Sequence, residues 1–410
     1  MESPVLRVLV PHLPGGRRPG RGRAWVAPHG GGGPVTATLE SVLRRYLTDL
    51  VREGVVPGCA LELSAPGRHI SLRAGCGDVE AGVPVSARTR FAVYSVTKAV
   101  TALAALRLVA DRALRLDGPV ADHLPGWVDG SGGTVRLIHL LSHTAGFTYG
   151  SRQGPVAEAY RAAGFVRSAP EGVTGTALYR RFSMLPRLFP PGRAWSYSLA
   201  SDVLGWVLTE VRGRPLREVL RAEVFEPLGM KDSSLMGDLD RGCPMAIVYR
   251  RGDPGGWQRA ESAMLDWGST TAPESGGAGL VTSAADLHGL ARAFAEQPET
   301  FLPRELWQCC TTNHVPGGRD LRSGVLSPLP GRAQRHVGYG FGIAVVLPGA
   351  REQPDLPPGE VGWEGSAGSF FFAVPSRRLS VAFLTHTHPF GELPCWRDVH
   401  RLVHRHGHGR

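Results

Sequence analysis

Hydrophobic positions along the chain follow two spacings, one typical of helices and one typical of strands. Helical spacing covers residues 38–53, with Gly54 at the position of a C-cap, and covers 99–109 again. Between them, 59–64 and 70–74 have strand composition and are joined by a turn that contains Pro and Gly. The first quarter of the chain therefore predicts a helix, two antiparallel strands and a second, buried helix.

Strand character returns near the end of the chain. Residues 340–347, 369–374 and 379–385 are rich in β-branched and aromatic side chains, and 396–403 has the spacing of a closing helix. We expect these strands to pair with the early ones, so that both chain ends build one sheet. The predicted fold class is α+β, an antiparallel sheet flanked by helices with an inserted, mostly helical lobe.

The predicted domain organisation has two parts. Residues 1–36 are rich in Gly, Pro and Arg, and we expect them to form a disordered extension. Residues 37–405 form one domain, with a sheet lobe from about 37–115 plus 276–405 and a helical lobe from about 116–275.

Helices are expected inside the helical lobe and at its boundary. Helical spacing covers 135–142, 203–211 and 215–230, and Tyr197 lies on the loop before the second of these. Ser283 is expected to N-cap a further helix that runs to residue 294.

Composition excludes several function classes. The 410-residue chain is 42% hydrophobic with a formal net charge of +10, but its arginines are scattered and no nucleic-acid motif accompanies them, so we expect no nucleic-acid partner. An apolar run of about 18 residues, which a membrane helix needs, does not occur. The N-terminal region also lacks the apolar core of a signal peptide. We therefore expect a cytoplasmic protein with no membrane partner.

Residues that often bind metals show no metal-binding pattern. The cysteines have neither CxxC pairs nor metal-ligand spacing, which favours buried thiols in a reducing compartment; they are Cys59, Cys76, Cys243, Cys309, Cys310 and Cys395. A group of histidines is expected at or near a frayed terminus, where a metal site is not predicted: His400, His404, His406 and His408.

Candidate chemistry centres on Ser95 and Lys98. They lie three positions apart at the start of a predicted helix, so both side chains face the same side, one turn apart. Only Lys98 and Lys231 are lysines among the 46 Lys and Arg residues. A desolvated lysine amine can accept a serine proton, whereas an arginine guanidinium stays charged. The retained lysine therefore favours a serine nucleophile with an amine beside it.

Separated segments resemble the serine β-lactamase and penicillin-binding protein superfamily, whose first signature is S-x-x-K. The resemblance spans residues from about 38 to 405 and implies a β-lactamase/transpeptidase-like fold. The matching segments are Ser95-Val96-Thr97-Lys98, Leu140-Leu141-Ser142-His143-Thr144-Ala145-Gly146, Tyr197-Ser198-Leu199, Glu226-Pro227-Leu228-Gly229-Met230, Gly276-Gly277-Ala278-Gly279-Leu280 and Trp363-Glu364-Gly365.

Two departures from that pattern point to a subfamily. Class C β-lactamases carry Tyr-x-Asn as their second motif, but Leu199 stands at the Asn position here. Their third motif is Lys-Thr-Gly or a His variant, whereas this chain has Trp363-Glu364-Gly365, and neither tryptophan nor glutamate binds a β-lactam carboxylate as an ammonium does. The set of motifs is similar to the family VIII carboxylesterases, which share the fold.

This resemblance implies a serine esterase mechanism. Ser95 would be the nucleophile, and Lys98 and Tyr197 would share removal of its proton and delivery of a proton to the leaving alcohol; which of the two is the general base stays open. The oxyanion hole would consist of the backbone N–H groups of Ser95 and Ser366. Water, or an alcohol in an acyltransferase, would then release the acyl group.

The resemblance also implies the ligands. We expect a small-molecule ester substrate, no metal and no cofactor, with substrate contacts from Trp363, Gly365 and Leu199. The alternatives are a β-lactamase or an acyltransferase on the same fold, or a catalytically inactive binding or scaffold protein. His143 is a conceivable base, but in this superfamily its segment is a structural turn. No serine stands in G-x-S-x-G, so an α/β-hydrolase nucleophile elbow is not predicted.

Overall fold

The computed structural model describes most of the chain after the N-terminal segment. Chain contacts divide it into two units, 1–35 and 36–410, and every described residue lies in the second. The extension predicted for 1–36 lies outside the described residues, and the lobe boundaries remain predictions. The described ranges are 38–130, 132–236, 244–252, 256–260, 273–325, 336–349, 356–388 and 393–406.

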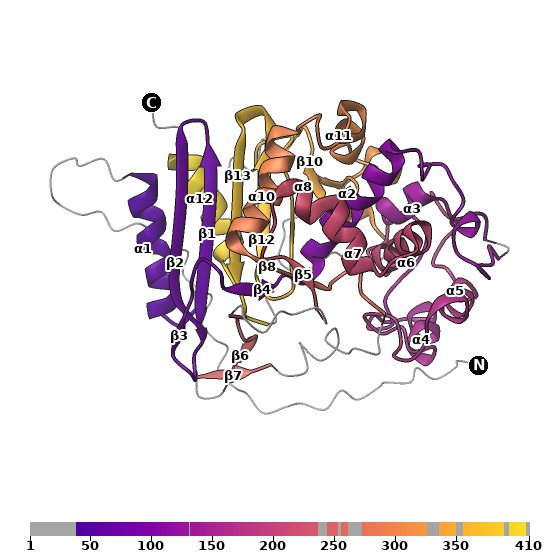
Figure 1. Ribbon diagram of the computed structural model, residues 1–410, viewed down its shortest axis with the longest axis horizontal. Coiled ribbons are helices and arrows are strands. Elements are labelled where there is room, and N and C mark those ends of the chain that lie inside the picture. The colour runs from indigo at the N-terminus through magenta and orange to yellow at the C-terminus, as the bar shows by residue number, and fades with distance from the viewer. Residues whose placement is uncertain are drawn as a thin grey trace, which may run out of the picture. The chain divides into compact units, whose positions relative to one another are not determined.

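The main sheet combines strands from both ends of the chain. Its strands are β1 (Gly58–Ala65), β2 (Arg68–Asp78), β3 (Val83–Pro84), β9 (Val337–Tyr339), β10 (Ala344–Val346), β11 (Val361–Glu364), β12 (Phe370–Val374) and β13 (Leu379–Thr385). Their order is β3-β2-β1-β13-β12-β11-β10-β9, with every neighbouring pair antiparallel (Figure 1). Cys59 of β1 lies opposite Thr385 of β13. The predicted sheet and its antiparallel sense are confirmed.

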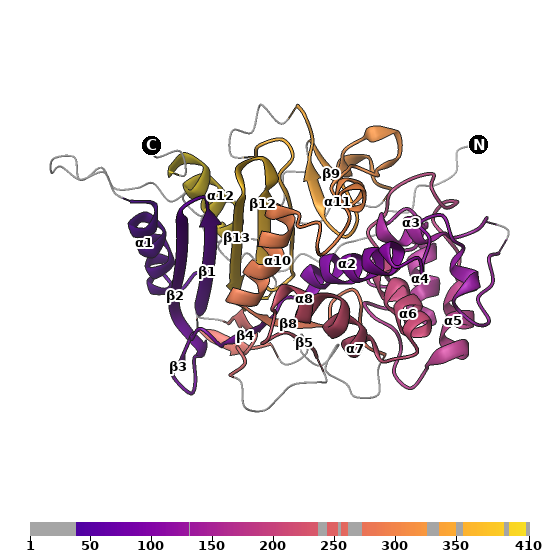
Figure 2. The same cartoon turned by 45° about the horizontal axis from the view of Figure 1, so that its top comes forward.

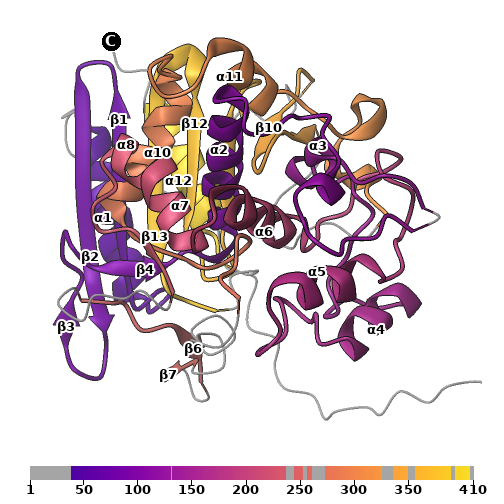
Figure 3. The same ribbon diagram turned by 45° about the vertical axis from the view of Figure 1, so that its right-hand side comes forward.

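Helices cover both faces of this sheet. Helix α10 (Ala284–Glu296) packs on one face, and α1 (Leu39–Arg52) and α12 (Cys395–His406) lie on the other (Figures 1 and 3). Thr38 caps α1 by accepting the Ser41 N–H at 3.2 Å, and Ser283 caps α10 by accepting the Asp286 N–H at 3.3 Å. No helix within the described ranges is both long enough and apolar enough to cross a membrane.

Helix α2 (Thr97–Ala110) lies between the sheet and the mostly helical part of the molecule (Figure 2). Eleven of its 14 residues are buried, which explains its apolar character on all sides. It contacts α6 (Ala200–Arg212) and α7 (Leu216–Leu220), and α3 (Leu137–Leu141) packs on α6. The remaining α-helices within the described ranges are α4 (Pro155–Ala162), α5 (Gly175–Ser183), α8 (Glu226–Leu228) and α11 (Arg304–Cys310).

Two small sheets were not predicted. The first has the order β4-β8-β5 and joins β4 (Arg90–Ala92), β8 (Leu280–Ser283) and β5 (Ser234–Leu235); the second pairs β6 (Tyr249–Arg251) with β7 (Trp257–Arg259). In the first sheet, Phe91 lies opposite Thr282. This pairing fixes the chain that leads into α2 beside the chain that precedes β8.

Two predicted elements are interrupted. Residues 340–347 do not form one strand, because a turn at Gly342 separates β9 from β10. Gly342 has φ +74°, and a Cβ there would lie 2.5 Å from the Lys98 carbonyl oxygen, so the turn packs directly on α2. Residues 215–230 are not one α-helix either, since a π-helical turn at Arg221–Phe225 separates α7 from α8.

The prediction of a frayed C-terminus is wrong for two of its histidines. His400 and His404 are 1% and 6% exposed on α12. Their Nε2 atoms lie 3.0 and 3.1 Å from the two carboxylate oxygens of Glu360, which is itself fully buried. The helix is ordered because this polar cluster and the surrounding apolar side chains attach it to the sheet.

Candidate active site

Ser95 lies in a single turn of 3₁₀ helix, Tyr94–Val96, between β4 and α2. Tyr94 has φ +44°, a left-handed conformation that is strained for a residue with a side chain. The Thr97 hydroxyl donates to the Tyr94 carbonyl at 2.5 Å and accepts the Leu280 N–H at 2.9 Å. Strand β8 therefore holds the turn that presents Ser95, whose side chain is half-buried.

Lys98 is the cation closest to this serine among the contacts of the described residues. Its side chain is 1% exposed, and its Nζ lies 3.4 Å from Ser95 Oγ. The same Nζ donates to the Gly277 carbonyl at 2.7 Å. The buried amine thus contacts both the Ser95 hydroxyl and a backbone carbonyl, within hydrogen-bond reach of the predicted nucleophile.

Tyr197 completes the cluster from the loop before α6, where the sequence placed it. Lys98 Nζ lies 4.7 Å from the centroid of the Tyr197 ring, within the range of a cation–π contact. Trp363 of β11 donates its indole N–H to the Tyr197 hydroxyl at 3.3 Å. The structure thus brings together Lys98 of α2, Tyr197 of the loop before α6 and Trp363 of β11.

Gly365 allows the end of β11 to approach the Ser95 turn. A Cβ at Gly365 would lie 2.2 Å from the Val93 carbonyl oxygen, a distance that real Cβ atoms do not show. Ser366 follows directly and is exposed. No backbone carbonyl of the described residues accepts the Ser366 N–H. The close approach gives the predicted oxyanion hole a physical basis, although its role stays a prediction.

The other predicted substrate contacts are deeply placed. Leu199 is 1% exposed at the start of α6, and Trp363 is 2% exposed. Both side chains support the site from within the hydrophobic core. Their contact with a substrate remains a prediction.

His143 packs against the cluster as a neutral ring. It is 1% exposed, with φ +56°, and its ring centroid lies 4.8 Å from that of Tyr197. The Ser198 N–H donates to His143 Nδ1 at 3.3 Å, which assigns the ring proton to Nε2. Burial, and then the charge of Lys98, holds the pKa of His143 well below its usual range. The buried ring packs against Tyr197, and its structural role stays a prediction.

Sequence reasoning missed two groups at this site. The Gly277 carbonyl accepts from Lys98, and Asp202 in the first turn of α6 is 3% exposed beneath it. Burial raises the pKa of Asp202, while the charge of Lys98 opposes that shift. The glycine motif at 276–279 was the available signal, but a sequence does not reveal which carbonyl meets the lysine.

One group of described residues has side-chain atoms close enough together to suggest a metal site. Glu62, His69 and His288 offer ligand atoms within 4.8 Å of one another, on β1, β2 and α10. The Glu62 carboxylate already accepts from the Arg73 guanidinium at 3.2 Å and from Ser71 at 2.7 Å. That guanidinium supplies the counter-charge, so the cluster is explained as an ion pair.

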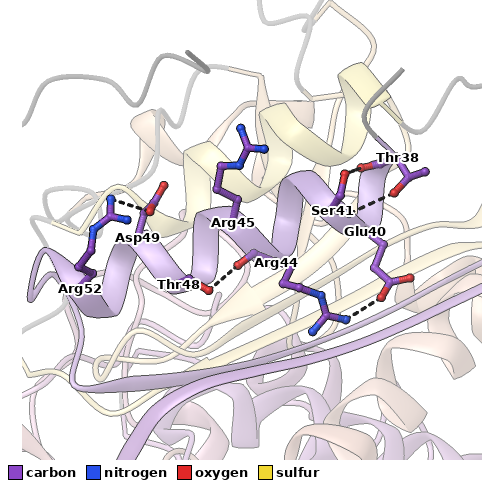
Figure 4. Close-up of a pocket in the computed structure, with 8 residues that line it drawn as sticks. All are labelled: Thr38, Glu40, Ser41, Arg44, Arg45, Thr48, Asp49 and Arg52. Atoms are coloured by element: carbon purple, nitrogen blue, oxygen red, sulfur yellow. Dashed lines mark hydrogen bonds and ion pairs between the residues drawn. The ribbon is translucent and has the colours of Figure 1, made fainter. Parts of the chain in front are cut away.

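A groove beside α1 is separate from Ser95. Its lining residues all belong to α1 or its cap, and they pair with one another, Arg44 with Glu40 and Arg52 with Asp49, each at 2.7 Å (Figure 4). None of them comes from α2, α6 or β11, the elements that form the Ser95 cluster or lie directly beside its residues.

Comparisons with known proteins agree with this geometry. The β-lactamase family profile matches residues 43–403. Esterase EstB of Burkholderia gladioli is 33% identical over 388 residues, covering 86% of this chain and 91% of that protein.

Solved structures show the same fold. EstCE1, described as a hydrolase with promiscuous acyltransferase activity, superposes with a TM-score of 0.75 at 26% identity and covers 89% of this chain and 98% of its own. A simvastatin synthase (LovD) variant from Aspergillus terreus superposes with a TM-score of 0.74 at 17% identity, over 92% and 97% of the two chains. The chain thus belongs to the β-lactamase family, among the β-lactamase-related serine hydrolases.

Proposed function

We propose that this protein is a serine carboxylesterase that hydrolyses small, uncharged esters through an acyl-enzyme on Ser95. The observation that carries the proposal is the 3.4 Å approach of the buried Lys98 Nζ to the half-buried Ser95 Oγ, with the Tyr197 ring 4.7 Å from the same Nζ. A hydroxyl becomes an effective nucleophile when an adjacent group takes its proton.

The proposed first step is attack of Ser95 Oγ on the ester carbonyl. The serine proton passes to Lys98 or Tyr197 and then to the departing alkoxide, which leaves as the alcohol. An ester bond to the alcohol breaks and an ester bond to Ser95 forms. Water attacks this acyl-enzyme in the second step, and the carboxylic acid is released with Ser95 restored.

The developing oxyanion needs hydrogen-bond donors that are already in position. We propose the backbone N–H groups of Ser95 and Ser366. The close approach of Gly365 to Val93 supports this pair, because it holds the end of β11 against the Ser95 turn. A larger residue at 365 would push the two segments apart.

The substrate class follows from what the site lacks. A β-lactam carboxylate needs a cation, but the described end of β11 offers Trp363, whose indole N–H is directed to the Tyr197 hydroxyl. The position that would hold an amide is Leu199, which is buried. Small esters need neither contact, so the site favours ester cleavage over β-lactam opening.

Acyl transfer is the second candidate. The name of EstCE1, 26% identical, includes acyltransferase activity beside hydrolysis. In both reactions the acyl-enzyme is the same, and only the acceptor differs, an alcohol in place of water.

The proposal includes a reducing compartment, with the cytoplasm as the location. The described cysteines are free thiols, and three are buried, Cys59, Cys310 and Cys395. Free buried thiols are usual in proteins of reducing compartments.

The test compares kcat/KM for p-nitrophenyl acetate and butyrate with kcat/KM for a chromogenic cephalosporin, each corrected for spontaneous hydrolysis. We expect clear turnover of both esters and little or no ring opening. Product analysis of the cephalosporin separates ring opening from cleavage of its acetyl ester. A ratio that favours ring opening would make this protein a divergent β-lactamase.

A further inference from the structure

A chain of hydrogen bonds leads from Lys98 to the carboxylate of Asp202. Lys98 Nζ donates to the Gly277 carbonyl at 2.7 Å. The N–H of the same peptide group, which belongs to Ala278, donates to Ser275 Oγ at 3.0 Å. Ser275 Oγ in turn donates to Asp202 Oδ1 at 2.6 Å. A cation and a carboxylate therefore terminate one polarised chain, which strengthens its bonds.

The two ends of this chain are both buried. Lys98 is 1% exposed and Asp202 is 3% exposed. A buried charge is costly unless an opposite charge and hydrogen bonds compensate it. Burial raises the pKa of Asp202, and Lys98 and the Ser275 hydroxyl act in the opposite direction. The two side chains thus lie within electrostatic reach of each other.

Packing fixes the peptide group between them. A Cβ at Gly277 would lie 2.6 Å from Asp202 Oδ2, and one at Gly276 would lie 2.4 Å from the Ser201 carbonyl oxygen. The Thr101 hydroxyl of α2 donates to the Gly276 carbonyl at 2.7 Å. The glycine segment is therefore held between α2 and the first turn of α6, with its carbonyl aimed at Lys98.

We propose that Asp202 is the buried counter-charge of Lys98 and positions its amine through Ser275 and the Gly277–Ala278 peptide. Asp202 is a positioning residue, since its carboxylate acts on the reacting atoms through Lys98. The kinetic consequence rests on the proposed esterase function, but the pairing itself does not.

Other titratable groups face the same pair. Ser95 and Tyr197 contact Lys98 directly, and His143 feels its charge. Tyr149 feels Asp202, and burial first, with further increments from Tyr197 and Asp202, raises its pKa well above the usual value. Removing the Asp202 charge leaves positive charge at the other end of the chain less well compensated, so the acid limb of the activity profile should move to lower pH.

The first test is a double-mutant cycle that needs no activity. Melting temperatures are measured for Asp202→Asn, Lys98→Met and the double variant. We expect each single substitution to lower Tm, and the double variant to lose less than the sum. Additive losses would overturn the proposal. If Asp202→Asn does not fold, Ser275→Ala, which breaks the chain at its hydroxyl, takes its place in the cycle.

Asp286 provides a matched control. It lies in the first turn of α10, is 7% exposed and accepts from Ser233 Oγ at 2.8 Å, so it has the same local setting without Lys98. Asp286→Asn combined with Lys98→Met should give additive losses in Tm. Non-additivity of equal size in this control pair would also overturn the proposal, because it would not then depend on the Asp202 chain.

The second test is kinetic, on p-nitrophenyl acetate. Asp202→Asn is expected to lower kcat at least about tenfold, with KM within about threefold, and to move the acid limb of the kcat/KM profile to lower pH. Asp286→Asn should leave the limb in place. An unmoved limb in Asp202→Asn would contradict the proposal. A wild-type protein that hydrolyses no ester would refute the proposed function, while the melting-temperature cycle would still decide the pairing.

Discussion

Two buried polar clusters of this protein differ in whether they contact a partly accessible side chain, and this difference separates a catalytic role from a structural one. Around Lys98, hydrogen bonds lead inward to Gly277 and outward to Ser95 Oγ, which is only half-buried. Around Glu360, both carboxylate oxygens meet histidines that are themselves buried, His400 and His404. The Lys98 cluster contacts a partly accessible hydroxyl and can therefore act on a bound substrate. The Glu360 cluster is enclosed on all sides and anchors α12.

The contacts within the Glu360 cluster favour the ionised form of its carboxylate. His400 Nδ1 lies 2.7 Å from the Trp396 carbonyl, which can only accept, so Nδ1 carries a proton. Burial raises the pKa of Glu360, but His400 and His404 more than offset it and hold the value at about 2. With the Glu360 carboxylate facing its Nε2, His400 contacts an oxygen atom through each of its ring nitrogens.

Substitution of Ser95 is the most direct test of the catalytic role of the Lys98 cluster. Ser95→Ala should lower kcat/KM for p-nitrophenyl acetate by about 10⁴-fold or more, because it removes the nucleophile. Only a small, half-buried hydroxyl is lost, so the unfolding free energy should change by less than about 1 kcal/mol. Residual activity within about tenfold of wild type would refute the assignment and favour the scaffold alternative.

Substitutions of Lys98 test whether catalysis needs proton transfer by this side chain or only its positive charge. Lys98→Arg keeps the positive charge but removes a titratable amine, and we expect a loss of about 10³-fold, equal to that of Lys98→Ala. Steady-state kinetics on the same ester measures both variants. Substantial activity in Lys98→Arg alone would show that Lys98 acts as a fixed charge.

The Glu360 cluster should respond in stability and not in catalysis. Glu360→Ala leaves the buried His400 and His404 rings without their shared partner, and we expect a loss of about 3 kcal/mol in unfolding free energy from urea titration. Activity per folded molecule should stay within about threefold. A large loss of kcat with unchanged stability would remove the distinction between the two clusters.

The same cluster predicts a smaller, pH-dependent effect. The pKa of Glu360 is lowered in the folded state, from 4.5 to about 2, so its stabilisation is complete above the unfolded value and is lost as pH falls toward the folded one. Between pH 4.5 and 3 the expected loss is about 2 kcal/mol. Glu360→Gln should show a correspondingly shallower decline, and equal slopes in both proteins would contradict this origin.

Local sequence patterns were sufficient to predict much of the fold. The α1 helix and the β1–β2 pair follow from helical spacing, turn residues and strand composition, although the C-cap of α1 is Glu53 and not the predicted Gly54. The fold class, the family and the β-lactamase-related hydrolase class are confirmed. The S-x-x-K spacing also brought Ser95 and Lys98 together, because that geometry depends on only four residues, although Ser95 lies in the 3₁₀ turn before α2.

Features that depend on long-range contacts were not predictable. Strands β4, β5 and β8 have two to four residues each, too few for a period, and form only because they pair across the chain. His400 looked terminal in sequence, but its partner Glu360 lies 40 positions earlier. The Gly277 carbonyl that accepts from Lys98 is a backbone group, which no side-chain pattern indicates.

Covalent labelling of the nucleophile tests the central claim most directly. The protein is treated with a serine-reactive fluorophosphonate and its peptides are mapped by mass spectrometry. The account predicts one adduct, on Ser95, with ester turnover falling in proportion to labelling and no adduct in Ser95→Ala. An adduct on another serine that accompanies the loss of turnover, or full turnover after complete labelling of Ser95, would contradict it.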